Sequence, residues 1–376
     1  MRIALVVPGG VDRSAEYRVI PAVLALIQRL SLDNDVHVIA LYQEPYAAEW
    51  DLLGARVHNI GLPRTGLRSI HKIFKLHRAA PFDIVQAIFS GTCGLVALLA
   101  GRLLKISSAV HVGGGELVSI PDIAYGGAQT LRGRLREAIV LRRVSAVTAA
   151  SAATIQALSR IGVAAQRLPL GVDLESWPPR HPLRRKPNEP ARLIHVASLN
   201  RVKDQTMLLE ALSLLLKAGC LFEMDIVGED ILGGEIQELA RRLQISQRLR
   251  FHGFLSQKRM RPLVEAAHVM ILTSRHETGP LAVLEAAVAG VPTVGTAVGH
   301  VAEWAPDAAV AVPVGNAELL AAAIQQILND EERRMRTAGE AFKRATLEDA
   351  DHTANGFRSL YTRLTRQAIN SRPLSS

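Results

Sequence analysis

The sequence has little cysteine, few aromatic residues and no long apolar run. Cys93 and Cys220 are its two cysteines among 376 residues, which excludes a disulfide scaffold and a cysteine-rich zinc site. The best apolar candidate, 94–104, is shorter than the roughly 18 residues that a membrane-spanning helix needs, and it contains Arg102. Aromatic residues make up 4% and form no interleaved platform, so nucleic acid is not an expected partner.

The N-terminal residues, MRIALVVPGG, are too few for a signal peptide and predict a first strand. Without a leader or a membrane span, the expected compartment is the cytoplasm. The hydrophobic fraction of 48% excludes wholesale disorder. The length favours two domains.

Positive charge is concentrated in one region of the chain. The formal net charge is +9, and residues 56–143 hold 13 Lys and Arg against 4 Asp and Glu, so 13 minus 4 gives the same excess of nine. Such a field attracts anionic membranes or anionic sugars, although a solvated basic face has the same composition. We therefore expect an anionic membrane surface as one partner of residues 56–143.

Short apolar runs alternate with helical periods over two stretches of the chain. Because strands spaced by helices predict parallel sheets, the fold class is α/β, with two Rossmann-like domains facing across a cleft. The first stretch includes a helix expected at 15–30, directly after the first strand and its glycines.

Residues 177–190 separate the two stretches. Five prolines in this segment cannot continue a helix or a central strand, which indicates an inter-domain linker. The expected domains are 1–176 and 191–350, and a C-terminal helix at 351–376 is expected to pack back toward the first domain.

Ligands of open α/β sheets bind at the carboxyl ends of the strands, which directs attention to particular loops. In the first half, Gly9 and Gly10 follow the first strand, and the run from Gly113 to Glu116 follows another. Glycines let the backbone approach a ligand, although a tight turn uses them equally well. His111 precedes the second loop, where a packing role is the simpler interpretation.

In the second half, the segment RHETGPLAVLEAAVAGVPTVGT gives the strongest signal. Glu277 lies in a polar loop, and Glu285 lies two turns into the helix that Gly279 and Pro280 open. The helix start offers N–H groups to a diphosphate, and Glu285 can reach a ribose. A solvated pair of glutamates is the alternative. Lys203, in another strand-to-helix loop, can pair with phosphate oxygens.

These loops resemble the family-four retaining glycosyltransferases of the GT-B fold. The resemblance covers nearly the whole chain. It is carried by an N-terminal glycine loop, a stretch before the linker, a diphosphate-binding turn, a Gly-containing strand end and an E-x7-E signature: GGVDRSAEYRVIPAVLALIQRL, LPLGVDLESWPP, SLNRVKD, FHGFLS and HETGPLAVLEAAVAGVPTVGT.

The resemblance implies transfer of a hexose-type sugar from a nucleotide sugar, a UDP-sugar or GDP-sugar, to a glycan or lipid-linked acceptor with retention at the anomeric carbon. It implies catalytic roles for Glu277 and Lys203. The implied donor-binding residues are Ser198, Arg201, Lys203, Gly228, Gly253, Phe254, Glu277, Thr278, Gly279, Leu281 and Glu285. The implied acceptor-side residues are Gly9, Gly10, His111, Gly113, Gly114 and Glu116.

The sequence departs from the family pattern at three places. Ser198 stands where the family has Arg, Gly279-Pro280 replaces Phe-Gly, and the family's N-domain histidine has no certain counterpart, with His111 two residues out of register. The family needs neither a metal nor a cofactor, and we interpret the one Asp-x-Asp, Asp33 to Asp35, as a turn before a strand.

The resemblance also implies synthesis of cell-surface polysaccharide or glycolipid by a cytoplasmic enzyme, peripheral at the inner face of the membrane. Two other function classes stay open at this point. A GT-B sugar-nucleotide 2-epimerase would act without an acceptor. A non-catalytic nucleotide-sugar or membrane-binding protein would bind a donor without turnover.

Overall fold

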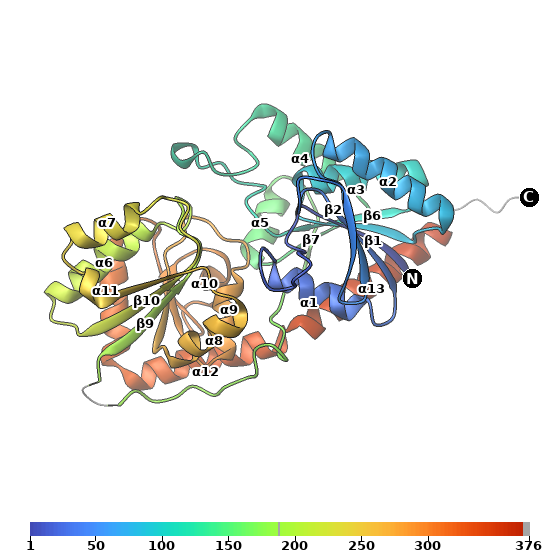
Figure 1. Ribbon diagram of the computed structural model, residues 1–376. Coiled ribbons are helices and arrows are strands. Elements are labelled where there is room, and N and C mark those ends of the chain that lie inside the picture. Colours follow the sequence, from blue (N-terminus) through green and yellow to red (C-terminus); the bar gives the residue numbers. More distant parts are fainter. Residues whose placement is uncertain (187–188, 371–376) are drawn as a thin grey trace, which may run out of the picture. The chain divides into compact units, whose positions relative to one another are not determined.

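The computed structural model describes residues 1–186 and 189–370, which form two compact α/β units (Figure 1). The first unit combines Met1–Leu170 with the C-terminal segment that begins at Ala350, and the second unit is Gly171–Asp349. Each unit has its own sheet and its own core. The expected α/β class with two sheet-containing domains is confirmed.

In the described chain the first unit has an eight-stranded sheet with the order β3-β4-β2-β1-β5-β6-β7-β8. Its strands are β1 (Arg2–Val7), β2 (Asp35–Ala40), β3 (Ala48–Leu52), β4 (Ala55–Asn59), β5 (Ile84–Ile88), β6 (Ser107–Val112), β7 (Ala146–Ala149) and β8 (Gln166–Arg167). Its helices are α1 (Pro21–Leu30), α2 (Thr65–Ala79), α3 (Gly91–Leu104), α4 (Leu131–Arg143), α5 (Ala152–Arg160) and α13 (Ala350–Asn370). The strands pair in parallel except β3 with β4.

Helices cover both faces of this sheet (Figure 1). Successive β1 side chains point to opposite faces, so Ile3 and Leu5 join the core under α1 and α13, while Ala4 and Val6 join the core under α2, α3 and α4. Phe357 of α13 is completely buried in the former. Burial of one such side chain contributes about 2 kcal/mol to the stability of the unit.

The second unit has a six-stranded parallel sheet with the order β11-β10-β9-β12-β13-β14 in the described residues. Its strands are β9 (Ala191–Val196), β10 (Phe222–Val227), β11 (Leu249–Gly253), β12 (Val269–Leu272), β13 (Thr293–Thr296) and β14 (Val310–Val312). Its helices are α6 (Gln205–Lys217), α7 (Glu235–Arg242), α8 (Gln257–Ala266), α9 (Leu281–Val288), α10 (Gly299–Trp304), α11 (Ala317–Asn329) and α12 (Glu331–Leu347).

The helix expected at 15–30 begins only at Pro21. Val19 instead forms bridges with Gly10 and Val11, and Ala15 and Arg18 adopt left-handed φ values that no helix contains. Proline at the first helical position lacks an N–H that the helix would leave unpaired anyway.

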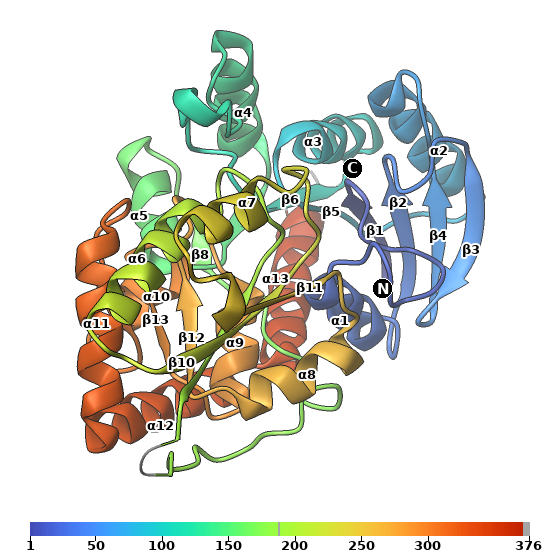
Figure 2. The same ribbon diagram turned by 60° about the vertical axis from the view of Figure 1, so that its left-hand side comes forward.

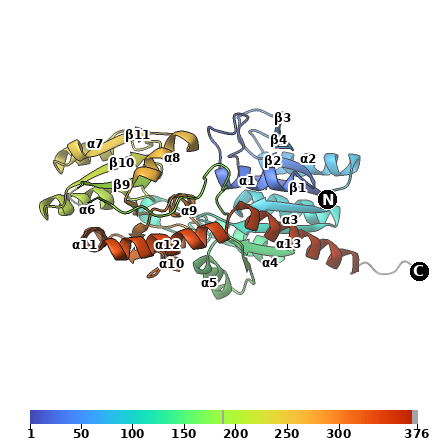
Figure 3. The same ribbon diagram turned by 90° about the horizontal axis from the view of Figure 1, so that it is seen from below.

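The antiparallel pair β3–β4 at the sheet edge was not predicted (Figure 2 and Figure 3). Exposed and buried side chains alternate along β3, which is the period-two pattern of an edge strand. The short elements α10 and β14 were also missed.

The expected linker, 177–190, does not coincide with the boundary between the two units. The chain passes between the units at Leu170–Gly171 and again at Asp349–Ala350, so the described part of 177–190 belongs to the second unit. Trp177 is 2% exposed in that unit's core, and the Arg180 amide donates to the Val288 carbonyl at 2.9 Å. Prolines exclude a helix here but not an extended segment that packs along a domain. Residues 187–188 lie outside the described chain.

The C-terminal helix belongs to the first unit. Helix α13 lies against α1 and β6, and Arg29 of α1 forms a 2.5 Å ion pair with Asp351. The end of the expected segment, 371–376, lies outside the described residues.

Candidate functional site

Two loops of the second unit meet where β9 and β12 end. The Asn200 side-chain oxygen accepts from the amides of Val202 and Lys203, each at 3.1 Å, which forms the turn after β9. The Thr273 hydroxyl donates to the Lys203 carbonyl at 2.8 Å, and the Arg275 amide donates to the Val202 carbonyl at 2.7 Å. These bonds fix the backbone that carries Lys203 against the loop after β12.

The Glu277 carboxylate is the centre of this junction. It forms an ion pair with the Lys203 ammonium and accepts a hydrogen bond from the Ser274 hydroxyl at 2.7 Å. The Lys203 side chain is 25% exposed and that of Glu277 13%, so both still reach solvent. Ser274 is fully buried, and its carbonyl accepts from the Thr296 hydroxyl at 2.6 Å. Sequence reasoning missed the orienting role of Ser274, three residues before Glu277.

A buried histidine lies beneath this junction. Nδ1 of His195 lies 2.9 Å from the Ile271 carbonyl, and Nε2 lies 3.1 Å from the Gln205 amide nitrogen. Burial lowers the pKa of His195 to about 4, so the ring is neutral at pH 7, with Nδ1 donating. The Gln205 amide also donates to the Ser198 carbonyl, which holds the end of β9 in place. Sequence reasoning found neither residue.

Glu285, expected to reach a ribose, is only 3% exposed. Its carboxylate accepts from the Gln257 side-chain amide at 2.5 Å, and Gln257 in turn accepts from the Trp177 indole at 3.1 Å. Burial raises the pKa of Glu285 to about 8, which makes the neutral acid the main form near pH 7. The structure thus places Glu285 beneath α8, and no sequence signal linked it to Gln257.

Two residues expected beside Lys203 lie apart from the Glu277 junction. Arg201 forms a 2.5 Å ion pair with Glu235, with both side chains about half exposed. Ser198 is exposed at the end of β9. Arg201 is therefore paired at the surface, whereas Lys203 contacts Glu277.

Two of the expected glycines of this unit serve different purposes, close backbone packing at Gly228 and a left-handed turn at Gly253. A side chain at Gly228 would bring its Cβ within 2.0 Å of the Ala197 carbonyl oxygen, and the Gly228 amide donates to the Gly253 carbonyl at 2.8 Å. Gly253 itself has a left-handed φ of 65°. Phe254, next along the chain, is 48% exposed.

Helix α9 starts directly after the Glu277 loop. Pro280 precedes its first residue, Leu281, so the helix begins where the apolar run indicated. Thr278 is buried, and Gly279 is partly exposed. A Cβ at Gly299 would lie 2.8 Å from Pro280 and 3.0 Å from Glu277, so glycine lets α10 begin against this loop.

In the first unit, the glycine loop after β1 is closed by the side chain of Gln43. Its oxygen accepts from the amides of Gly10 and Val11 at 2.6 and 3.0 Å. A Cβ at Gly9 would lie 3.2 Å from the same oxygen. Gln43 therefore occupies the space from which a ligand was expected to approach this backbone. Sequence reasoning missed Gln43.

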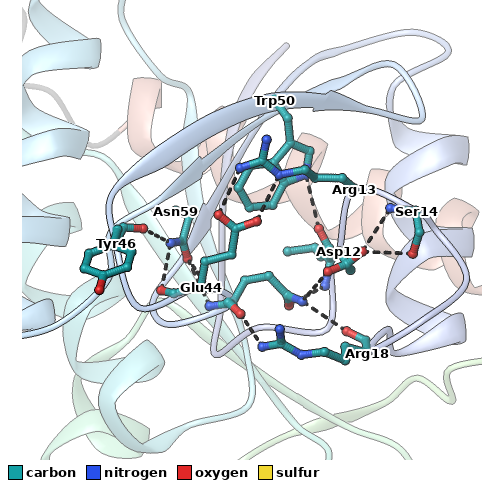
Figure 4. A network of polar contacts seen from close by, with 10 residues as sticks. Asp12, Arg13, Ser14, Arg18, Glu44, Tyr46, Trp50 and Asn59 are labelled. Carbon is teal, nitrogen blue, oxygen red and sulfur yellow. Dashed lines mark hydrogen bonds and ion pairs between the residues drawn. The ribbon is translucent and has the colours of Figure 1, made fainter.

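A network of polar side chains surrounds this loop (Figure 4). Arg13 forms two 2.9 Å bonds to Glu44 and lies over the Trp50 ring at 4.8 Å (Figure 4). The Trp50 indole donates to the Val11 carbonyl at 3.2 Å. The Asn59 side chain bonds the backbone at both Gln43 and Glu44. The loop is thus tied to the ends of β2 and β4.

His111, which the resemblance assigned to the acceptor side, is buried in the first unit. His111 lies inside β6 with no exposed surface, 3.0 Å from the Thr148 hydroxyl and edge-on to the Phe357 ring. Burial lowers its pKa to about 4. It faces the core under α13 because alternate strand residues point to opposite faces, so its side chain belongs to the packing of the unit.

The glycines after β6 form one wall of a pocket of about 350 Å³. Glu116 lines it, but its carboxylate accepts from the amides of Ser90 and Gly114 at 3.0 and 2.7 Å and thereby ties two loops together. Burial raises the pKa of Glu116. Gly113 sits against the rings of His111 and Phe89. Tyr42 and Tyr125 also line this pocket, which lies at the carboxyl ends of the first unit's strands.

The structure therefore groups the predicted residues by unit. Lys203, Glu277 and the start of α9 come together in the second unit, and Gly114 and Glu116 come together in the first. Across residues 1–186 and 189–370, no group of three metal-ligating side chains is close enough to hold an ion. No helix within those same ranges is long and apolar enough to cross a membrane.

Comparison with known proteins identifies both units. A family model described as "Glycosyl transferases group 1" matches residues 181–344, and one described as "Glycosyl transferase 4-like domain" matches residues 19–171. A glycogen synthase of Mycobacterium tuberculosis is 29% identical over 178 residues, which cover 47% of this chain and 42% of that protein. The match thus spans less than half the length of that relative.

Solved structures share the fold at low identity. Sucrose-phosphate synthase from Thermosynechococcus elongatus has a TM-score of 0.81 and 18% identity, with 98% of this chain and all of that chain covered. The Anabaena protein HepE in complex with UDP-glucose has a TM-score of 0.75 and 18% identity, with 97% and all of the chains covered. With a family model on each of its two units, the chain belongs to the group 1 glycosyltransferases and has the GT-B fold.

Proposed function

We propose that this protein moves a hexosyl group from a nucleoside diphosphate sugar to a glycan or lipid-linked acceptor, with retention at the anomeric carbon. The observation that carries the proposal is the contact of Lys203 and Ser274 with one carboxylate, Glu277, beside the start of α9. This arrangement combines a cation for phosphate, a helix start and a carboxylate for a sugar within two adjoining loops.

The donor class is supported by charge. Lys203 carries a partly exposed ammonium, and the first amides of α9 add the positive end of the helix dipole. Both would stabilise the diphosphate as it leaves the sugar, when its negative charge grows. The relative HepE was solved with UDP-glucose, which favours a UDP-sugar as the first donor to test.

In the free protein, Lys203 pairs with Glu277. A bound diphosphate would compete for this ammonium, so the Glu277 carboxylate would be released toward the donor sugar. Ser274 would keep that carboxylate oriented during the exchange, because its hydroxyl bonds Glu277 independently of Lys203. The chain's own residues thus couple arrival of the diphosphate to the availability of the carboxylate.

The acceptor side of the proposal concerns the first unit. Its pocket of about 350 Å³ combines the rings of Tyr42 and Tyr125 with the Glu116 loop. Aromatic faces and a few polar groups suit a sugar ring. We assign the acceptor, a growing glycan or a lipid-linked sugar of a cell-surface polysaccharide or glycolipid, to this pocket.

A titration of UDP-, GDP- and ADP-glucose into wild type and Lys203→Ala tests the donor assignment. We expect one nucleotide class to bind and the Lys203→Ala variant to raise its Kd at least about tenfold, since a charge-assisted bond to phosphate is lost. Arg201→Ala, which removes a nearby cation already paired with Glu235, is the matched control and should change Kd less than about twofold. Equal losses in both variants would contradict the role of Lys203.

Product analysis separates transfer from the other function classes. Proton NMR of the product should show the donor's anomeric configuration and should require an added acceptor. A UDP-sugar converted without an acceptor would instead indicate epimerisation, and binding without any turnover would indicate a non-catalytic protein. We also propose that turnover needs no metal, so excess EDTA should leave the rate unchanged.

A further inference from the structure

Helix α4 of the first unit presents an exposed apolar stripe bordered by arginines. Leu131, Leu135 and Ile139 are 79%, 59% and 45% exposed, and their spacing of four places them along one face. The opposite face of the helix, with Val140 and Leu141, is buried in the core of the unit. The leucines are therefore not needed to hold the helix to its sheet.

Basic side chains border this stripe on both sides. Exposed arginines of α4 lie on either side of the apolar residues at 100° per residue: Arg132 and Arg143 on one side and Arg134 on the other, with Arg142 inside the stripe. The only acidic residue in α4, Glu137, is buried and bonded by its neighbour Arg136. The exposed face of α4 thus combines large apolar side chains with positive charge alone.

We propose that this face of α4 docks the protein on an anionic lipid bilayer, with Leu131, Leu135 and Ile139 inserted below the headgroups and the arginines at headgroup level. A helix with an apolar stripe and flanking basic residues lies in the plane of such an interface. This inference does not depend on the proposed function, because it concerns a different surface.

Two other occupants fit this face less well than a lipid bilayer. A second copy meeting this face symmetrically would bring arginine against arginine, which disfavours association. Single-stranded nucleic acid would need aromatic side chains for its bases to stack on, and the exposed face of α4 has none. A surface with dense negative charge above an apolar interior complements both parts of the stripe.

The other basic region, around α2, fits insertion less well. Its groove of about 1100 Å³ is lined by Arg64, Arg68 and Lys75, but it also holds Glu49, which pairs with Lys72 at 2.5 Å. Within α2, only Leu67 is a strongly exposed large apolar side chain. We therefore assign long-range attraction to the anionic membrane to α2, and insertion of apolar side chains into the membrane to α4.

An introduced tryptophan tests the docking directly. The chain's own tryptophans, Trp50, Trp177 and Trp304, are all buried, so Leu135→Trp supplies an exposed reporter. With vesicles of equal parts phosphatidylcholine and phosphatidylglycerol, its emission should shift to shorter wavelength, and with phosphatidylcholine alone it should not. Vesicle binding without a shift would overturn the assignment to α4, as would an absence of binding.

Co-sedimentation with the same vesicles tests charge and apolar contacts separately. Arg132→Gln with Arg143→Gln should weaken binding by about fivefold per residue, and Leu135→Ser should weaken it at any salt concentration. Matched controls on the second unit are Arg241→Gln with Arg242→Gln on α7 and the half-exposed Leu319→Ser on α11. Controls that weaken binding equally would contradict the proposal.

Sedimentation velocity without vesicles tests whether a second copy of the chain covers the stripe. The wild type is expected to sediment as one species that Leu135→Ser leaves unchanged. A dimer that this substitution dissociates would show that a second copy covers the stripe, and would overturn the lipid assignment.

Discussion

Ser274 fixes the direction of the Glu277 carboxylate from a fully buried position. Replacing it with alanine removes one hydrogen bond to a charged group, typically about 2 kcal/mol. We predict that Ser274→Ala lowers kcat by about tenfold or more and leaves the Kd for the donor nearly unchanged, since Lys203 is retained.

Ser274→Thr keeps the hydroxyl and should restore part of the rate. Steady-state kinetics together with a donor titration provide the measurement. A parallel loss of donor affinity in Ser274→Ala would mean that the whole loop had shifted, and that Ser274 supports the fold and not the carboxylate.

Glu285 makes stability depend on pH. Burial raises its pKa from 4.5 to about 8, so between these values the folded state holds a proton that the unfolded chain releases. The free energy of unfolding therefore falls as pH rises from about 4.5 to 8 and levels off above pH 8. This group contributes up to several kcal/mol to the fall. Denaturant unfolding at several pH values measures the slope.

Glu285→Gln is the control for this prediction. It keeps an acceptor for Gln257 but cannot ionise, so its stability relative to the wild type should increase across the same pH range. A difference between the two proteins that does not change with pH would show that Glu285 is ionised, or exposed, in the folded protein.

At this scale, the sequence could single out Lys203 and Glu277, which the structure brings into contact, because each lies in a loop whose neighbours follow a local pattern. It could not identify Gln43, Gln257 or His195. Each of these contacts a partner far along the chain or on another strand, as Gln43 does with Gly10, so that the spacing of residues holds no trace of it.

The loop after β1 shows what a single side chain does for an element. Gln43 supplies the acceptor for the amides of Gly10 and Val11, and Val11 is fully buried. We predict that Gln43→Ala costs about 1 to 3 kcal/mol and accelerates hydrogen exchange at these two amides.

Glu44→Ala is the matched control, because it removes only the partly exposed pair with Arg13 and should cost less than about 1 kcal/mol. Exchange rates at Gly10 that are the same in both variants would show that Gln43 does not close the loop. Thermal unfolding and exchange mass spectrometry together measure both effects.

The pattern of apolar residues predicted helices and strands correctly wherever the packing of the folded chain agreed with it. The strand at β12 and the helices α6 and α9 lie at the residues that apolar runs indicated. Expectation failed at 15–20, where bridges from Val19 replace helical bonds, and at 177–186, where a proline-rich segment belongs to the second unit. At 15–20 these contacts override local helix propensity, and at 177–186 they decide which unit the segment joins.

At the scale of the whole molecule, α13 completes the first unit from the far end of the chain. Phe357, Leu360 and Tyr361 of α13 fill the core that α1 and β1 leave open. We predict that Phe357→Ala lowers the stability of the first unit by about 3 to 5 kcal/mol, because a large cavity remains.

Phe357→Ala should not change the stability of the second unit, since the core of that unit contains no α13 residue. Calorimetry with and without a UDP-sugar should show the transition of the first unit at lower temperature in Phe357→Ala, while the ligand-stabilised transition stays in place. Leu347→Ala, at a position 74% exposed, is the control and should move neither transition. A loss of donor binding in Phe357→Ala would contradict the independence of the units.

The fold class followed from alternation alone, but the division of the chain did not. Proline content indicated a boundary at 177–190, whereas the units exchange at 170–171 and 349–350. A boundary depends on which core each segment joins, and Trp177 joins the second core by contacts that only the folded chain reveals.

This division has a consequence for synthesis on the ribosome. Residues 1–170 leave the ribosome first. Helix α13, whose Phe357 fills part of their core, follows only after the entire second unit. At about 5 to 20 residues per second, that interval lasts roughly ten to forty seconds. During it, the nascent first unit carries an open apolar face while the second unit, whose residues are contiguous, has everything it needs to fold. The domain that is translated first is therefore finished last, and the waiting apolar face is where a chaperone would be expected to bind the growing chain.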